Sequence, residues 1–266
     1  MLRQRIITVA WLAPLMLAGL FGLTGGAFAL FTAMIVLLAG WEWTDLSGVE
    51  APGQRLALLG GLAALMWLLW LSGALLATWP LWIALAGWLV NLYWVTRYPD
   101  RLSQWHTTPR RLAMGLWVLL PAWVGLYLLR EAGATWLLFL LLLVWGADIG
   151  AYFAGRKFGK RKLAPRVSPG KSWEGVFGGM AVTAVLAMVF AFWEELGGGG
   201  FVALLGITLM VTLASVLGDL LESMLKRHRG RKDSSHLLPG HGGVLDRIDS
   251  LTAALPLFAL LTAGGL

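Results

Sequence analysis

Two aspartates lie inside long apolar stretches, where a carboxylate is unexpected. Asp148 falls within residues 143–152, LVWGADIGAY, and Asp219 within residues 215–223, SVLGDLLES. Placing an acidic side chain at the centre of a bilayer costs on the order of 2.5–3.5 kcal/mol on insertion scales, so such residues commonly serve function. The alternative is an interfacial acid or a polar partner between helices. We take both residues as candidates for the active centre.

The residues after Asp219 repeat at helical spacing. Asp219, Glu222, Ser223 and Lys226 occupy positions i, i+3, i+4 and i+7, which share one face of a helix. Two carboxylates, a hydroxyl and an ammonium group are therefore expected to point into one space.

A second acidic pair, Asp246 and Asp249, has i, i+3 spacing at the start of the last apolar stretch. Asp249 or Ser250 alternatively caps a helix that begins there. Paired carboxylates with cations nearby suit Mg²⁺ together with a phosphate-rich substrate.

The segment 167–175, VSPGKSWEG, combines backbone-bending residues with Ser168, Lys171 and Ser172. A helix is expected to begin soon after it. Exposed main-chain amides at a helix start, with a lysine and two hydroxyls, form an anion site. The phosphate loop of soluble NTPases does not match, because Pro165 stands where that pattern requires glycine and no strand is expected before it. A basic topogenic loop is the simpler alternative.

The segment 239–249, PGHGGVLDRID, surrounds His241 with glycines. Glycine lets the backbone approach a ligand closely. His241 is suited to donating a hydrogen bond to a phosphate or to moving a proton.

The elements that carry these residues are predicted to be membrane-spanning helices. The 266 residues are 58% hydrophobic and only 13% charged, and cysteine is absent, which excludes disulfides. We expect an all-α polytopic protein with about nine spans and one domain, 1–266, whose catalytic part is mainly 140–250. Most stretches approach the length of about 20 residues that crosses a bilayer; they are 6–23, 27–43, 56–78, 79–95, 112–129, 134–154, 175–193, 201–221 and 250–264.

The positive charges predict the topology. With a cytoplasmic N-terminus, 20 of the 21 Lys and Arg residues fall in cytoplasmic segments and only Arg130 does not. The C-terminus is then periplasmic. The same division accounts for the net charge of +7 without nucleic-acid binding. Reading the first stretch as a cleaved signal peptide is the alternative, but the run is long for one.

The polar residues resemble the signature of the phosphatidate cytidylyltransferase (CDP-diacylglycerol synthase) family, bacterial type. The resemblance begins upstream at 41–43, WEW, at Asp148 with Tyr152, and at 168–172. It is strongest in the signature itself, which runs through Ser223, Lys226, Arg227, Lys232, Asp233, Pro239, His241, Gly242, Gly243, Asp246, Arg247 and Asp249.

The resemblance implies Mg²⁺-dependent transfer of CMP from CTP to phosphatidate at the cytoplasmic face of the inner membrane, by a chain that can form a homodimer. The expected catalytic residues are Asp148, Asp219, Lys226, His241 and Asp246. The expected substrate-binding residues are Ser168, Lys171, Ser172, Ser223, Arg227, Lys232 and Arg247. The expected Mg²⁺ ligands are Asp219, Asp246 and Asp249.

Two other functions stay open at this point. A CTP-dependent lipid kinase also brings a nucleotide to a membrane substrate, but it releases CDP instead of pyrophosphate. A proton-coupled transporter also carries intramembrane acids, yet it needs a pathway open to both sides. The polar residues here gather on one side only, which favours the transferase.

Overall fold

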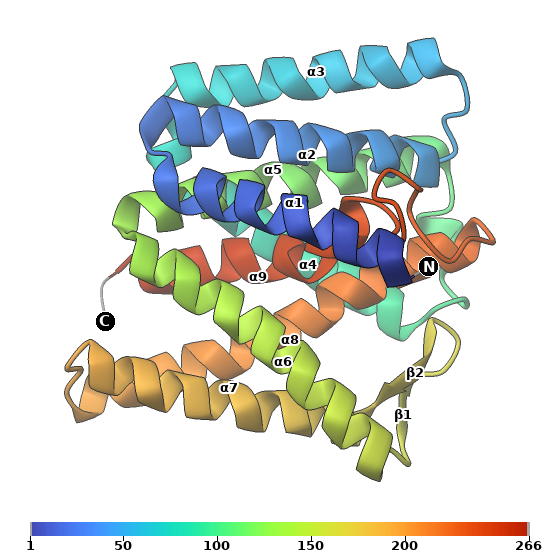
Figure 1. Ribbon diagram of the computed structural model, residues 1–266. Helices are drawn as coiled ribbons and strands as arrows, with labels where there is room; N and C mark the ends of the chain where they lie inside the picture. Colours follow the sequence, from blue (N-terminus) through green and yellow to red (C-terminus); the bar gives the residue numbers. More distant parts are fainter. Residues whose placement is uncertain (1, 265–266) are drawn as a thin grey trace.

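The protein is a bundle of α-helices with one short β-hairpin at its edge (Figure 1). The computed structural model describes residues 2–264, without the side chains at positions 2, 3, 5 and 6. The helices of this part are α1 Leu2–Gly22, α2 Gly25–Leu46, α3 Pro52–Leu71, α4 Trp79–Thr96, α5 Thr108–Ala132, α6 Ala134–Phe158, α7 Trp173–Trp193, α8 Gly198–His228 and α9 Leu245–Thr262. The hairpin is β1 Lys162–Ala164 with β2 Ser168–Ser172, and two 3₁₀ turns, Ala74–Leu76 and Leu102–Gln104, flank α4.

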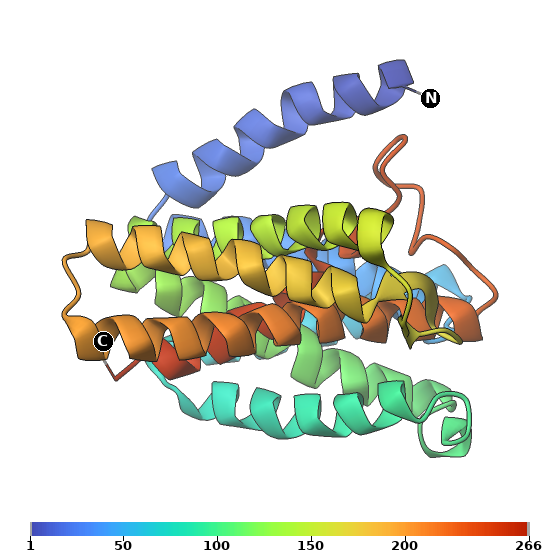
Figure 2. The same cartoon turned by 90° about the horizontal axis from the view of Figure 1, so that it is seen from below.

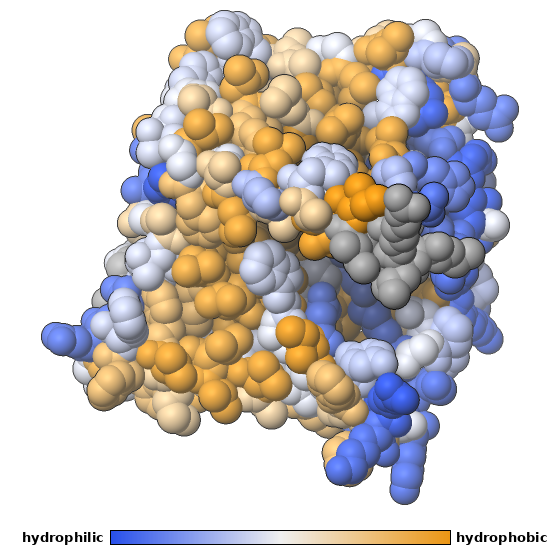
Figure 3. Space-filling model, viewed as in Figure 1, coloured by the Kyte–Doolittle hydropathy of each residue, from blue (hydrophilic) through white to orange (hydrophobic). Residues whose placement is uncertain are grey.

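The helical content and its apolar surface confirm an all-α, multi-pass membrane protein. Six helices, α2, α3, α5, α6, α7 and α8, are long and apolar enough to cross a membrane, and Ile7–Gly22 of α1 is a shorter apolar segment. Apolar residues cover most of the face in Figure 3, whereas hydrophilic residues gather at the edge where the hairpin lies in Figure 1. This is the division expected of a protein immersed in lipid.

The two ends of the bundle differ in charge. The last turns of α6 and α8 are basic, with Arg156 and Lys157 in the first and Lys226 and Arg227 in the second. Both helices end near the hairpin, at the end of the bundle where α1 begins, and α9 ends at the opposite side (Figures 1 and 2). Arg130 lies away from this basic end, donating to the carbonyl oxygens of Phe21 and Leu23 beside the α1–α2 connection.

Several boundaries differ from those expected. Helix α3 ends at Leu71, and a 3₁₀ turn, Ala74–Leu76, lies in the gap before α4. Helix α8 continues to His228, so the whole series from Asp219 to Lys226 is helical. Helix α9 begins at Leu245, five residues before the expected span. Asp249 therefore lies inside the helix, and the interpretation of Asp249 as its N-cap is wrong.

Glycines let helices α6 and α7 pack closely. A β-carbon on Gly150 would lie 2.6 Å from the carbonyl oxygen of Gly178, and one on Gly179 would lie 2.8 Å from that of Ala147. Small residues at such crossings allow the backbones to touch. The crossing holds Asp148 of α6 beside the start of α7 and the hairpin that precedes it.

Helices α8 and α9 cross at another glycine. A β-carbon on Gly218 would clash with the carbonyl oxygen of Asp249 and would lie 3.1 Å from the α-carbon of Ser250. The crossing therefore requires glycine at position 218. It also brings Asp219, the next residue along α8, beside Asp249 of α9.

Candidate active site

Asp219 forms an ion pair with the lysine of the hairpin. The Nζ atom of Lys171 lies 2.6 Å from Oδ2 of Asp219, and both side chains are about three-quarters buried. The hydroxyl of Ser223 donates to Oδ1 of the same carboxylate at 3.1 Å. Asp148, Lys171, Ser172 and Asp219 together line a cavity of about 340 Å³ between α6, α7, α8 and β2. The structure thus brings these four predicted residues to one place.

The segment that carries Lys171 is a strand and not the loop expected from its Pro and Gly. Ser168–Ser172 forms β2, paired antiparallel to β1 with Lys162 opposite Ser172 and Ala164 opposite Ser168. Helix α7 begins directly afterwards, as expected. The hydroxyl of Ser172 accepts a hydrogen bond from the Gly175 amide at 3.2 Å and so caps α7.

Two contacts fix the hairpin against the helices. The carboxylate of Glu174 accepts hydrogen bonds from the main-chain amides of Lys160 and Arg161. The Nε of Arg227 donates to the carbonyl of Val167 at 3.2 Å. Arg227 therefore anchors the hairpin to α8. Ser168 lies at the far end of β2, away from the residues that line the cavity around Lys171.

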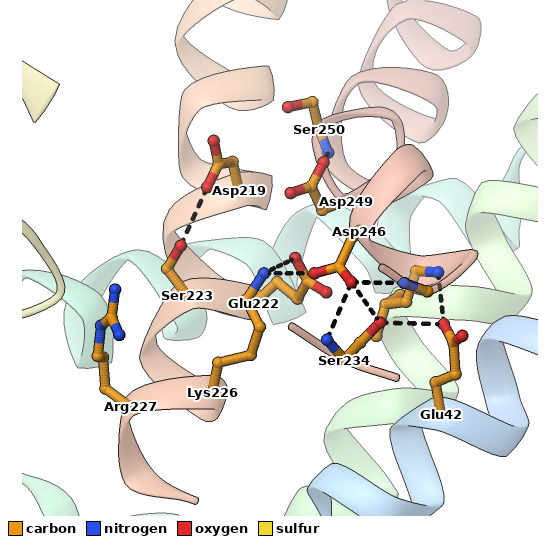
Figure 4. A network of polar contacts seen from close by, with 12 residues as sticks. Glu42, Asp219, Glu222, Ser223, Lys226, Arg227, Ser234, Asp246, Asp249 and Ser250 are labelled. Atoms are coloured by element: carbon orange, nitrogen blue, oxygen red, sulfur yellow. Dashed lines mark hydrogen bonds and ion pairs between the residues drawn. The ribbon is translucent and has the colours of Figure 1, made fainter. Parts of the chain in front are cut away.

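Glu222 and Lys226, the other charged residues spaced along α8 after Asp219, face α9 and not the hairpin. Lys226 Nζ lies 2.7 Å from Oε2 of Glu222 and 2.6 Å from Oδ1 of Asp246. All three side chains are largely buried, with Glu222 only 2% exposed. Figure 4 shows this group beside the start of α9, while Asp219 and Ser223 point elsewhere. The single face expected from the spacing therefore serves two groups.

Asp246 is held by main-chain and hydroxyl donors as well as by Lys226. Its Oδ2 accepts from the amides of Ser234 and Gly243 at 2.9 and 2.8 Å and from the Ser234 hydroxyl at 2.8 Å. Both carboxylate oxygens are thus engaged. Asp246 ties the loop 229–244 to the start of α9.

Glu42 of α2 is a buried acid that the sequence-based site did not include. It is 0% exposed and accepts from the amides of Val244 and Leu245 at 2.9 and 2.6 Å. The hydroxyls of Ser234 and Ser235 also contact its carboxylate. Glu42 therefore supplies the cap of α9 from a distant helix (Figure 4). The signal that singled out Asp148 and Asp219, an acid within an apolar stretch, also applies to Glu42.

His241, Lys232 and Arg247 form a separate group. They line a cavity of about 510 Å³ together with Asp233 and His236. A bridge between Leu238 and Gly242 closes the turn that holds His241, whose Nδ1 is buried without a hydrogen-bond partner among the described residues. Glycines 240 and 242 adopt positive φ angles of 77° and 79°, conformations that favour glycine.

The donor chemistry suits a hard cation. Among the described residues, no group of three or more His, Cys, Asp or Glu side chains stands ready to hold a metal ion. The carboxylate of Asp249 nevertheless points from α9 toward α8, while that of Asp219, on α8, points toward the hairpin and meets Lys171 (Figure 4). Oε1 of Glu222 is buried nearby without a hydrogen-bond donor. Oxygen ligands of this kind fit Mg²⁺, which commonly takes one or two carboxylates and completes its shell with phosphate oxygens and water.

The fold and the site define a multi-pass membrane protein with a lysine- and carboxylate-lined polar centre at one end of its helices. Residues 3–263 match the Cytidylyltransferase family, so the chain belongs to that family.

Relatives resemble the chain along almost its whole length. The phosphatidate cytidylyltransferase of Pseudomonas aeruginosa is 50% identical over 273 residues, covering 100% of this chain and 98% of the relative. The enzyme of the same name from Haemophilus influenzae is 40% identical, covering 97% and 98%. That from Brucella suis is 38% identical, covering 98% and 93%.

Proposed function

We propose that the protein is a phosphatidate cytidylyltransferase, which transfers CMP from CTP to phosphatidate and releases CDP-diacylglycerol and pyrophosphate. Full-length similarity to enzymes of that name supports the activity. The observation that carries the assignment to a site is the Lys171–Asp219 pair, which lines a cavity with Asp148 between three apolar helices. A cation and a carboxylate are thereby available where a lipid phosphate and a nucleotide can meet.

The reaction is a displacement at phosphorus. A phosphate oxygen of phosphatidate forms a bond to the α-phosphorus of CTP, and the bond from that phosphorus to the bridging oxygen of the β-phosphate breaks. Pyrophosphate carries away the electron pair. The attacking oxygen is already anionic, so no strong base is required. The difficulty is bringing two polyanions together, and positioning and charge neutralisation are expected to dominate.

The residues divide this work by position. Lys171 binds a phosphate by exchanging Asp219 for it, and Ser172 and Ser223 orient the groups beside it. Lys232, Arg247 and His241 bind phosphate oxygens from the second cavity. Lys226 and Asp246 hold the loop that lines the second cavity, and Asp148 supports Lys171.

A bound Mg²⁺ would be held by Asp219 and Asp249, with Asp246 a candidate ligand if it leaves Lys226. When bound, the ion would offset the negative charge of the triphosphate. The described residues then need supply no more than one or two carboxylates, since CTP brings its own oxygen ligands.

The topology extends the same proposal. We infer nine spans, with α1, α4 and α9 crossing alongside the six longer apolar helices, and a cytoplasmic N-terminus. The basic ends of α6 and α8 then face the cytoplasm, in keeping with the positive-inside rule. The protein would reside in the bacterial inner membrane with its active site toward cytoplasmic CTP, as a monomer or homodimer.

The test is a product assay with purified protein in detergent, supplied with CTP, phosphatidate and Mg²⁺. We expect pyrophosphate and CDP-diacylglycerol in equal amounts. Release of CDP with a phosphorylated lipid would instead identify a lipid kinase, and absence of lipid-dependent CTP turnover would refute the proposal. Flux measurements in liposomes test the transporter alternative.

A further inference from the structure

A large apolar groove lies directly beside the candidate active site. Its volume is about 770 Å³, within the range of roughly 300–1,000 Å³ typical of ligand sites. Its walls come from the end of α4, the hairpin, the start of α7 and the middle of α8. Leu92 and Val95 of α4 and Leu213 and Leu217 of α8 contribute apolar side chains to its lining.

The groove and the catalytic cavity share walls. Val176 of α7 and Val216 of α8 line both spaces. The hairpin also serves both, since residues 163–167 line the groove and residues 170–172 line the cavity. Asp219 faces the cavity. Val216, one turn earlier on α8, lies between the cavity and the groove. A molecule with a phosphate at Lys171 therefore has an apolar space within reach.

The groove has one polar end. Arg166 and Asp100 line it and form an exposed ion pair at 3.3 Å, with Arg166 65% exposed. The rest of the lining is almost wholly apolar. The α8 wall from Leu220 back to Leu213 extends about 10 Å along the helix axis, at 1.5 Å per residue. An apolar channel with a charged pair at its mouth matches an amphiphile.

We propose that this groove binds one fatty acyl chain of the lipid substrate and so positions its phosphate at the Lys171–Asp219 pair. The inference rests on the proposed function. The shared valine wall favours this occupant over a second copy of the chain, because it places the groove directly next to the catalytic cavity. The groove acts by orienting the substrate, since an acyl chain gains little hydrophobic free energy on moving from lipid into an apolar protein groove.

The experiment compares chain lengths in variants that obstruct the groove. Leu213→Trp and Leu92→Trp each place a large side chain in the groove lining, one from α8 and one from α4. Val189→Trp is the matched control, because Val189 is 60% exposed on α7 and lies outside the groove. Purified proteins are assayed with dihexanoyl and dioleoyl phosphatidate in mixed micelles. We expect the ratio of kcat/KM for the dioleoyl to the dihexanoyl substrate to fall about tenfold in both groove variants, as displacement from the reacting geometry predicts, and to stay unchanged in the control.

Other results would overturn the inference. An unchanged ratio would show that no acyl chain occupies the groove. An equal loss of kcat/KM on both substrates would show that these residues serve folding and not substrate orientation. Conversion of a dimer to a monomer by the groove variants would identify a second copy as the occupant. If wild-type protein turns over neither substrate, the proposed function itself fails.

A second measurement needs no variant. Wild-type protein is irradiated with a phosphatidate that carries a diazirine in its acyl chain. We expect labelling within residues 92–100 or 213–220 that dioleoyl phosphatidate suppresses and phosphatidylcholine does not. Labelling elsewhere, or equal suppression by both lipids, would contradict the proposal.

Discussion

Removing the Glu42 carboxylate tests whether α2 fixes the start of α9. In Glu42→Ala, the amides of Val244 and Leu245 lose their acceptor. An unsatisfied buried donor costs about 1–3 kcal/mol, so two such groups cost roughly 3 kcal/mol at a moderate estimate. This exceeds the loss of a typical solvent-exposed helix cap, about 1 kcal/mol. Glu42→Gln keeps one oxygen acceptor and should lose about half as much.

The assay is hydrogen exchange in detergent, followed for peptides covering residues 234–246. A local loss of about 3 kcal/mol corresponds to roughly 100-fold faster exchange, since each 1.4 kcal/mol is tenfold. Specific activity should fall at least about tenfold in Glu42→Ala, because the same loop supplies the amides that hold Asp246. Peptides from α6 and α7 should keep their protection.

Glu50→Ala is the control. Glu50 follows the same helix, but its side chain is 86% exposed and lies 3.9 Å from Arg229. A surface change of this kind is expected to stay within about 0.5 kcal/mol. Unchanged exchange of residues 234–246 in Glu42→Ala, together with wild-type specific activity, would refute the reasoning.

The other predictions concern the carboxylates, the α8–α9 crossing and the topology. Asp219→Asn should lower turnover by about 100-fold at normal membrane abundance, with partial rescue by Mg²⁺, as expected for one strong electrostatic contact. Asp246→Asn should lower membrane abundance as well as turnover, because its hydrogen-bond partners become unpaired. Immunoblots of the membranes, combined with specific activity, separate the loss of turnover from the loss of abundance. Gly218→Ala should lower the free energy of unfolding by about 1–3 kcal/mol by overpacking, measured as lower thermal stability in detergent. A β-carbon at Gly206 on the same helix meets nothing within 4 Å, so Gly206→Ala should be neutral or stabilising. Equal effects of the two variants would argue against a close crossing. A reporter at the C-terminus should be periplasmic and one inserted near Arg161 cytoplasmic, and the reverse for either would contradict nine spans with a cytoplasmic N-terminus.

Local spacing predicted the helical elements and the residues of α8 well. The i, i+4 contacts of Ser223 with Asp219 and of Lys226 with Glu222 follow directly from helical geometry. The same geometry could not reveal that these pairs have different neighbours. Those neighbours come from the hairpin and from α9, and their placement depends on tertiary packing.

Long-range contacts explain what the sequence could not reveal. Glu42 and the amide of Leu245 are 203 residues apart. The local sequence does not reveal that contact, so it favours Asp249 as a cap near the expected start of the helix. Because Glu42 provides the cap from α2, α9 can begin earlier. The β-hairpin was missed for a similar reason: Pro169 and Gly170 favour a loop locally, whereas pairing with β1 and the anchors at Glu174 and Arg227 hold them extended.

The two lysines of the site differ in how readily they can exchange a carboxylate for a phosphate. Lys171 has one carboxylate partner, and its side chain is 25% exposed. The hairpin that carries it is fixed independently by Glu174 and Arg227, so its ammonium can move without unfolding the strand.

Lys226 is only 12% exposed and is held by both Glu222 and Asp246. Removing one member of a buried charged group costs about 3–5 kcal/mol. A phosphate would have to overcome that cost to recruit Lys226, but it would displace only a single, more exposed contact to recruit Lys171. Lys171 is therefore the better phosphate ligand, and Lys226 chiefly positions Asp246.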